Sequence, residues 1–232
     1  MIAQVINGVA ILIGALIGNK VRGGISDRFR SILMQAMALA GMLIGLLGAV
    51  KTTDALTVVI CLAIGAVIGE GINIEKRLEG LGDGIKRRLK GAEATFTEGF
   101  VSASLIFCVG AMAIVGSLDA GLRSEYSTIL TKSLIDGITA TVLASTLGIG
   151  VAFSGLAVLI YQGAITLLAG LLQPLLTDLI ITEMSAVGGL LIFAIGLNMQ
   201  GMTKIRVGNL LPAIFVPMVY IPLYQWIAAF FK

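Results

Sequence analysis

The chain alternates long apolar stretches with short polar ones, and the apolar stretches have the length of membrane-spanning helices. A helix needs about 20 mostly apolar residues to cross the hydrocarbon core of a bilayer. The pattern predicts an all-α fold, a polytopic transmembrane bundle of about eight spans that forms one domain over residues 1–232. The stretches lie near residues 2–21, 31–50, 54–72, 98–117, 128–148, 152–172, 184–202 and 208–231.

The last stretch holds three prolines, Pro212, Pro217 and Pro222. Proline removes a backbone hydrogen bond, and membrane helices tolerate it where neighbouring groups pair with the freed carbonyls. We therefore expect the last span to be kinked or partly irregular.

Basic residues gather after the first, third and seventh stretches. Segments 20–30, 76–90 and 204–206 hold most of the 16 lysines and arginines. Because loops rich in these residues stay in the cytoplasm, the three segments are predicted to be cytoplasmic and both termini to lie outside the cytoplasm. The acidic loop residues are then expected on the outer side: Asp54, Asp119, Glu125, Asp178 and Glu183.

Segment 73–97 is predicted to be a cytoplasmic, basic, amphipathic linker. Its apolar residues recur at helical spacing among lysines and arginines, which is typical of an interfacial helix on anionic membrane lipid. Gly80, Gly82 and Gly84 weaken a helix, so a solvated basic loop is the alternative. The apolar residues are Ile74, Leu78, Leu81, Ile85 and Leu89.

A weak internal repeat relates the two halves of the chain. Gly14, Ser31 and Gly41 recur at one constant spacing as Gly110, Ser127 and Gly137. Each copy would contain three spans. Because three is odd, the second copy would enter the membrane from the opposite side, which makes the repeat inverted, as in many secondary transporters. It predicts repeats at 1–72 and 98–173 and two additional spans in 174–232. Glycine- and leucine-rich sequence also produces such matches by chance.

Composition excludes several classes of protein. Only 12% of residues are charged and the mean hydropathy is +1.02, whereas soluble domains carry about 25% charged residues. The net charge of +3 comes with no nucleic-acid motif, and histidine is absent. Cys61 and Cys108 lie in apolar stretches and are interpreted as packing residues. We expect no nucleic-acid partner, no cofactor, no metal site and no enzymatic activity.

Lys132 and Asp136 lie one helical turn apart inside the fifth stretch. Ionised residues inside a membrane are costly, and they usually face a protein interior or a water path. Lysine can reach toward the headgroups along its stem, whereas aspartate cannot. Asp136 is therefore the stronger candidate for binding a solute or ion. The repeat pairs Lys132 and Asp136 with Ala36 and Ala40, so the charges would belong to one copy only.

Further polar residues extend this candidate site. Thr139 continues the polar face of the fifth stretch, and Gln162 places an amide in the sixth. Glu70 ends the third stretch beside closely spaced glycines and is a candidate gate or proton site. Gln4 and Asn7 add amides to the first stretch, and the sequence alone does not rank them as site candidates. For all of these residues, bridging between helices is the alternative role.

Several motifs together resemble the bacterial membrane family known as domain of unknown function 554, which has YqgA-like members. The resemblance covers nearly the whole chain and implies a polytopic protein of the bacterial cytoplasmic membrane, with transport as the usual expectation. The resemblance supports Lys132, Asp136 and Asn209, which lie in these motifs, and Gln162, which follows the motif at 144–154, as candidate site residues. The motifs are GAVIGEGINIEK at 65–76, KSLIDG at 132–137, ASTLGIGVAFS at 144–154, SAVGGLLIFAIGL at 185–197 and NLLPA at 209–213.

These observations predict a transporter or channel-like carrier for a small polar or ionic solute. Asp136 would bind a cation or proton, and Lys132 would neutralise it or bind an anionic group. The alternative is a membrane scaffold or regulatory protein in which Lys132 and Asp136 only hold helices together. Spans rich in small residues expose faces that can pack, so we expect a homo-oligomer, with a dimer as the default.

Overall fold

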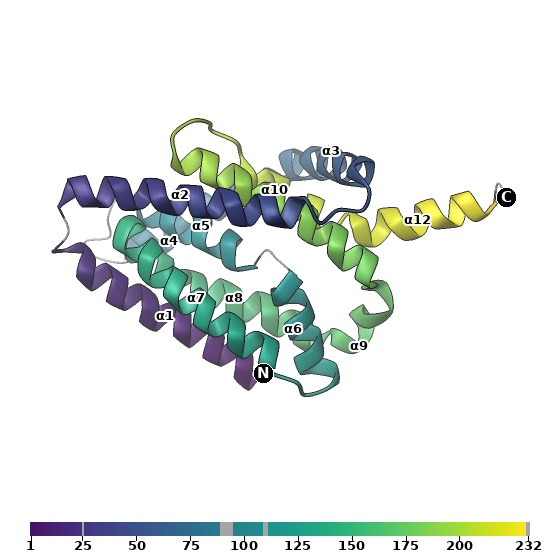
Figure 1. Cartoon of the computed structure of the whole chain (residues 1–232), viewed down its shortest axis with the longest axis horizontal. Helices are drawn as coiled ribbons and strands as arrows, with labels where there is room; N and C mark the ends of the chain where they lie inside the picture. The colour runs from purple at the N-terminus through teal and green to yellow at the C-terminus, as the bar shows by residue number, and fades with distance from the viewer. Residues whose placement is uncertain (25, 89–94, 109–110, 231–232) are drawn as a thin grey trace.

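The computed structural model describes residues 1–24, 26–88, 95–108 and 111–230. The described residues form α-helices and short 3₁₀ segments and no strand, which confirms the all-α prediction (Figure 1). The α-helices are α1 (Ile2–Arg22), α2 (Asp27–Ala49), α3 (Ala55–Ile72), α4 (Ile74–Arg88), α5 (Phe96–Cys108), α6 (Ala111–Leu122), α7 (Ser127–Leu147), α8 (Gly150–Leu167), α9 (Ala169–Leu172), α10 (Asp178–Met199), α11 (Val207–Leu210) and α12 (Pro217–Phe230). The 3₁₀ segments are η1 (Gln173–Leu175) and η2 (Leu211–Ile214).

Each expected span coincides with a helix or a bent pair of helices. In the described part of the chain, 5 helices are long and apolar enough to cross a membrane, namely α1, α2, α3, α8 and α10, and two bent pairs raise the number to 7. Helix α7 has 21 residues but is absent from this count. Its charges and hydroxyls lower its apolarity, so the expected eight spans are an approximate number.

Two spans are broken. The axes of α5 and α6 differ by 60°, so the span expected over 98–117 is a bent pair of helices. The expected break in the last span is present, because Val207–Ile214 and Pro217–Ile227 meet at 44°. A bend of this size in a membrane helix has an identifiable cause, and here Pro217 begins the second segment.

The linker and one acidic residue also differ in part from expectation. Residues 74–88 form α4 in spite of their glycines, so the alternative of an irregular loop is wrong there, while 89–94 lie outside the described residues.

Glu183, expected in an outer loop, lies inside α10 and is 1% exposed. Its carboxylate accepts hydrogen bonds from the Thr52 hydroxyl at 2.5 Å and the Thr53 amide at 2.8 Å. Glu183 therefore ties the turn between α2 and α3 to α10.

Glycines set which helices lie side by side. Helix α1 packs along α7, and α2 packs along α10, in two neighbouring pairs (Figure 1). A side chain at Gly14 would place its Cβ 2.1 Å from the Gly137 carbonyl oxygen, and one at Gly45 would place it 2.6 Å from the Gly189 oxygen. Such spacing lets backbones approach closely, as small residues do in membrane bundles.

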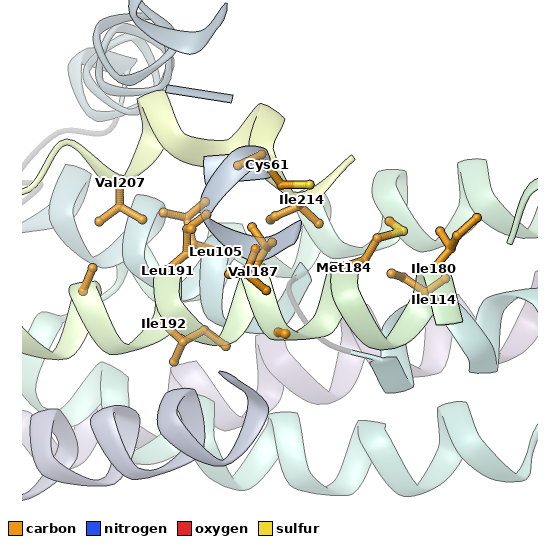
Figure 2. Packing of buried hydrophobic residues seen from close by; sticks show 14 of the residues in the cluster. Cys61, Leu105, Ile114, Ile180, Met184, Val187, Leu191, Ile192, Val207 and Ile214 are labelled. Carbon is orange, nitrogen blue, oxygen red and sulfur yellow. The ribbon is translucent and has the colours of Figure 1, made fainter. Parts of the chain in front are cut away.

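The largest apolar core surrounds α10. Met184, Val187 and Leu191 of this helix pack with Cys61 of α3, Leu105 of α5 and Ile214 of η2 (Figure 2). Two thirds of the apolar window of α10 is buried, against 11% for that of α2. Helix α10 is thus central, whereas the outer face of α2 is available to lipid.

Candidate functional site

Three helices contribute polar side chains to one buried cluster. On α1, α7 and α8 the polar residues stand three or four positions apart, so each pair lies on one face of its helix. Packing of α1 against both α7 and α8 brings the three faces together. The buried polar cluster consists of Gln4, Asn7, Lys132, Asp136, Gln162 and Thr166.

The charged pair lies at the centre of this cluster. Lys132 Nζ forms an ion pair with Asp136 Oδ2 along one turn of α7, and the two side chains are 8% and 7% exposed. The ammonium also lies 6.0 Å from the centroid of the Phe107 ring on α5, at the edge of cation–π range. The pair thus lies beside the last turn of α5.

Amides connect the pair to the neighbouring helices. Asn7 Nδ2 donates to Asp136 Oδ2 and to Gln162 Oε1, both at 3.1 Å. One turn away, Gln4 Nε2 donates to the Thr166 hydroxyl at 2.7 Å, and this hydroxyl donates to the Ser117 carbonyl at 3.1 Å. One set of hydrogen bonds therefore joins α1, α7 and α8, and a second set joins α1, α6 and α8.

Three polar atoms of the cluster have no hydrogen-bond partner among the described residues. They are Gln4 Oε1, Asn7 Oδ1 and Gln162 Nε2, and all three side chains are 0% exposed. A buried polar atom left unpaired costs about 1–3 kcal/mol, so such atoms are rare unless a ligand or water binds them. Three of them in one cluster indicate capacity for a further polar group.

The structure brings together only part of the predicted site. Asp136, Lys132 and Gln162 meet as expected, and the unranked amides Gln4 and Asn7 complete the cluster. Thr139 is half-buried and takes part in no described hydrogen bond, so the structure does not connect it to the buried polar cluster. Sequence reasoning missed Thr166, although its position four residues after Gln162 on the same helix was a usable signal.

Glu70 of α3 and Asn209 of α11 form a second cluster. Asn209 Nδ2 donates to Glu70 Oε2 at 2.7 Å, and the Glu75 amide donates to Asn209 Oδ1 at 2.7 Å. Arg206 pairs with Glu70 at 2.6 Å, and both side chains are more than half exposed. No described hydrogen bond joins these residues to Asp136, so the predicted candidates belong to two separate places.

An acidic cavity lies between α4, α5 and α10. Its volume is about 420 Å³, and the described residues that line it include four carboxylates and no lysine or arginine. Asp136 is not among them, so the cavity does not reach the buried polar cluster. The lining residues are Glu75, Glu79, Asp83, Thr97, Glu98, Val101, Ser102, Leu105, Ile195, Asn198, Met199, Ile205, Val207 and Gly208.

Glu75 connects the cavity to the second cluster. Burial, together with the nearby Glu79, raises the pKa of Glu75 above its ordinary value of 4.5, while the Gly208 amide, which donates at 2.5 Å, and Arg206 act in the opposite direction. A raised pKa in the folded state means that the folded protein binds this proton more tightly than the unfolded chain. The stabilising contribution is full below pH 4.5 and is lost as pH rises through the raised value.

We therefore expect Glu75→Gln to reduce the loss of thermal stability that the wild type shows as pH rises above 4.5. Glutamine keeps an oxygen that accepts from Gly208 but does not ionise. Melting temperatures of the purified protein in detergent, measured across this pH range, test the expectation. Parallel curves for wild type and variant would contradict it.

Comparison with known proteins agrees with the resemblance found in the motifs. The model of the family described as "Protein of unknown function (DUF554)" matches residues 2–222. The chain is 35% identical to the uncharacterized membrane protein YdfK of Bacillus subtilis, over 95% of this chain and 96% of that protein. It is 31% identical to the uncharacterized protein YqgA of Escherichia coli, over 94% and 95%. No solved structure matches the chain.

Proposed function

We propose that this chain, which belongs to the DUF554 family, is a membrane carrier for a small polar or ionic solute. The buried polar cluster is its binding site, with Asp136 as the principal binding group. No covalent step is required, so the proposed activity is not enzymatic.

One observation carries this proposal. A charged pair and three amides meet inside an apolar bundle, and three polar atoms there lack partners among the described residues. Polar groups that serve only to hold helices together stabilise a bundle most when every donor and acceptor is paired. Unpaired amide atoms beside an intramembrane carboxylate are better explained by a solute that binds there.

The two broken spans support the same function. The α5 to α6 break follows Phe107, which lies beside Lys132, and the bend before Pro217 follows the segment that holds Asn209. Secondary transporters commonly bind their solutes at discontinuous helices near the middle of the membrane. The inverted repeat over 1–72 and 98–173 would add an architectural parallel, and it stays a prediction.

We place the protein in the bacterial cytoplasmic membrane with both termini outside the cytoplasm. The basic segments 20–30, 76–90 and 204–206 support this orientation. A hydrogen bond from Arg22 to Thr95 and one from Thr95 to the Leu147 carbonyl show that the end of α1, the start of α5 and the end of α7 lie together. This gathered end would be cytoplasmic. A homodimer is the proposed assembly.

The test is transport by purified protein in liposomes. A panel of labelled ions and small polar solutes is offered to vesicles that contain either the wild type or Asp136→Asn. We expect wild-type flux of at least one solute and loss of this flux in the variant, with equal protein incorporation. Thr139→Val is the matched control on the same helix and should transport normally. Equal flux in Asp136→Asn and wild type would overturn the assignment.

The second candidate function is a membrane scaffold or regulatory protein. One observation favours it: the acidic cavity stops short of the buried polar cluster, because its lining residues on α5 end at Leu105. In that case the cluster only joins helices. Absence of flux for every solute in the panel, with a stable double variant Lys132→Met and Asp136→Leu, would support this function.

A further inference from the structure

We infer that Asp136 binds a monovalent cation in exchange for the ammonium of Lys132, and that carbonyl oxygens of Gln4 and Asn7 complete the cation site. The inference rests on the proposed function and narrows its solute or coupling ion to a cation. Its basis is the set of unpaired oxygens, the number of carboxylates and the charge of the neighbouring cavity.

The unpaired oxygens are the first argument. Gln4 Oε1 and Asn7 Oδ1 are buried carbonyl oxygens without partners among the described residues. The amide of Asn7 is already in contact with the carboxylate, since its Nδ2 lies 3.1 Å from Asp136 Oδ2. Gln4 stands one turn away on the same face of α1, a rise of about 4.5 Å. Carboxylate and carbonyl oxygens are the ligands that hard cations prefer.

The third unpaired atom has a different role. Gln162 Nε2 is a donor and does not ligate a cation. The Oε1 of the same residue accepts from Asn7 at 3.1 Å and holds the Asn7 amide beside Asp136. Gln162 thus positions an oxygen ligand and leaves its own donor for water or for an acceptor on a solute.

The charge of the site indicates a monovalent cation. Asp136 is the carboxylate of the buried polar cluster, and in the described part of the chain no three histidine, cysteine, aspartate or glutamate side chains gather as metal ligands. Divalent cations are usually held by several carboxylates or by an octahedral shell. One carboxylate with neutral carbonyls balances one positive charge.

Lys132 is positioned to release Asp136. It lies five residues after Ser127, where α7 begins, so it is about 8 Å from that end of the helix. Its four-carbon stem can carry the ammonium toward the headgroup region, whereas Asp136 has no such reach. When a cation arrives and the ammonium leaves, the buried charge stays balanced. The ammonium therefore acts as an internal competitor for the cation.

The acidic cavity extends along α5 toward the buried site and ends before it. Glu98, Val101, Ser102 and Leu105 line it at helical spacing along one face of α5. The next turn of α5 contains Phe107, whose ring lies 6.0 Å from Lys132 Nζ. The four carboxylates of the cavity, with no basic residue among its described lining residues, concentrate cations and repel anions. The cavity thus selects the same class of solute as the buried site.

Removal of Lys132 should make the protein more sensitive to cations, whereas removal of Asp136 should abolish the response. Melting temperatures of wild type, Lys132→Met, Asp136→Asn and the double variant Lys132→Met with Asp136→Asn are measured in detergent, with sodium or potassium chloride replacing choline chloride at constant ionic strength and pH. We expect the cation to stabilise the wild type and to stabilise Lys132→Met at about tenfold lower concentration, because its competitor is gone. Both variants that lack the carboxylate should not respond. Lys132→Gln, which keeps a donor for Asp136, is the second variant should methionine prevent folding.

The outcomes separate this inference from the proposed function. A cation effect of equal size in all variants is an ionic-strength effect and overturns the inference, as does the absence of any effect in wild type and Lys132→Met. If Asp136-dependent flux of a neutral solute is found in liposomes without a cation effect on melting, the carrier function stands and the cation site fails. A cation effect confined to proteins that keep Asp136, without flux, supports the site and removes the carrier function.

Discussion

Replacing Lys132 by methionine in choline buffer is expected to lower the free energy of unfolding by about 3–5 kcal/mol, the usual cost of removing one member of a buried ion pair. Asp136 then keeps only the hydrogen bond from Asn7 as partner among the described contacts. The reciprocal change Asp136→Leu should cost less, because Lys132 can extend toward the membrane surface. Adding Asp136→Leu to Lys132→Met should restore most of the loss, since apolar replacements of a buried pair are often tolerated.

The measurement is a double-mutant cycle, with unfolding in mixed micelles followed by circular dichroism. Asn7 retains Gln162 as an acceptor in the double variant, so the cycle isolates the interaction free energy between Lys132 and Asp136. Thr139→Val on the same helix is the control and should be nearly neutral, because Thr139 is half-buried and makes no described hydrogen bond. Additive effects of the two single changes, without restoration, would contradict the buried pair.

Replacing Gly45 by alanine is expected to destabilise the bundle by about 1–3 kcal/mol, whereas the same change at Gly41, one turn earlier, should be neutral or stabilising by up to about 1 kcal/mol. A Cβ at Gly45 would lie 2.5 Å from the Phe193 amide nitrogen and 2.6 Å from the Gly189 oxygen, both backbone atoms that cannot move independently of α10. At Gly41 no atom lies within 4 Å of the added Cβ.

The two glycines form a matched pair on α2, with the same change in chemistry and in intrinsic helix propensity. Unfolding in micelles again gives the difference in stability. The absence of a loss at both positions would show that α2 does not pack on α10 through Gly45. A loss at Gly41 as large as that at Gly45 would instead indicate that a second copy of the chain contacts this face.

Most of the helices were predictable from the sequence, for a local reason. Hydropathy over about 20 residues identifies a span whatever its neighbours are, and Pro212, Pro217 and Pro222 indicated the broken last span. The bend between α5 and α6 was not predictable in this way, because VSASLIFC and AMAIVGSL contain no proline and read as one apolar stretch. Local composition does not distinguish a straight apolar span from a bent one.

The candidate site was predictable only where its residues lie on one helix. Lys132 and Asp136 were recognisable as a pair because they are one turn apart. Asn7 and Asn198 were equivalent by sequence, each an amide in an apolar stretch. In the structure, Asn7 contacts Asp136, whereas Asn198 pairs with the Ile205 backbone and closes the turn after α10. The packing of the helices separates a residue of the proposed binding site from a structural one.

The sequence alone determined that the chain is an all-α membrane protein with an unusual charged turn in one span, because hydropathy and helical period are local properties. Only the tertiary structure decided that Asn7, 129 positions away in the chain, donates to Asp136, and that Glu70 and Asn209 form a different cluster. The physical reason is that in lipid no difference in hydrophobicity selects which helix faces meet. Close approach at glycines such as Gly14 and Gly137 makes this selection, and the fit between two surfaces distant in sequence leaves no local pattern.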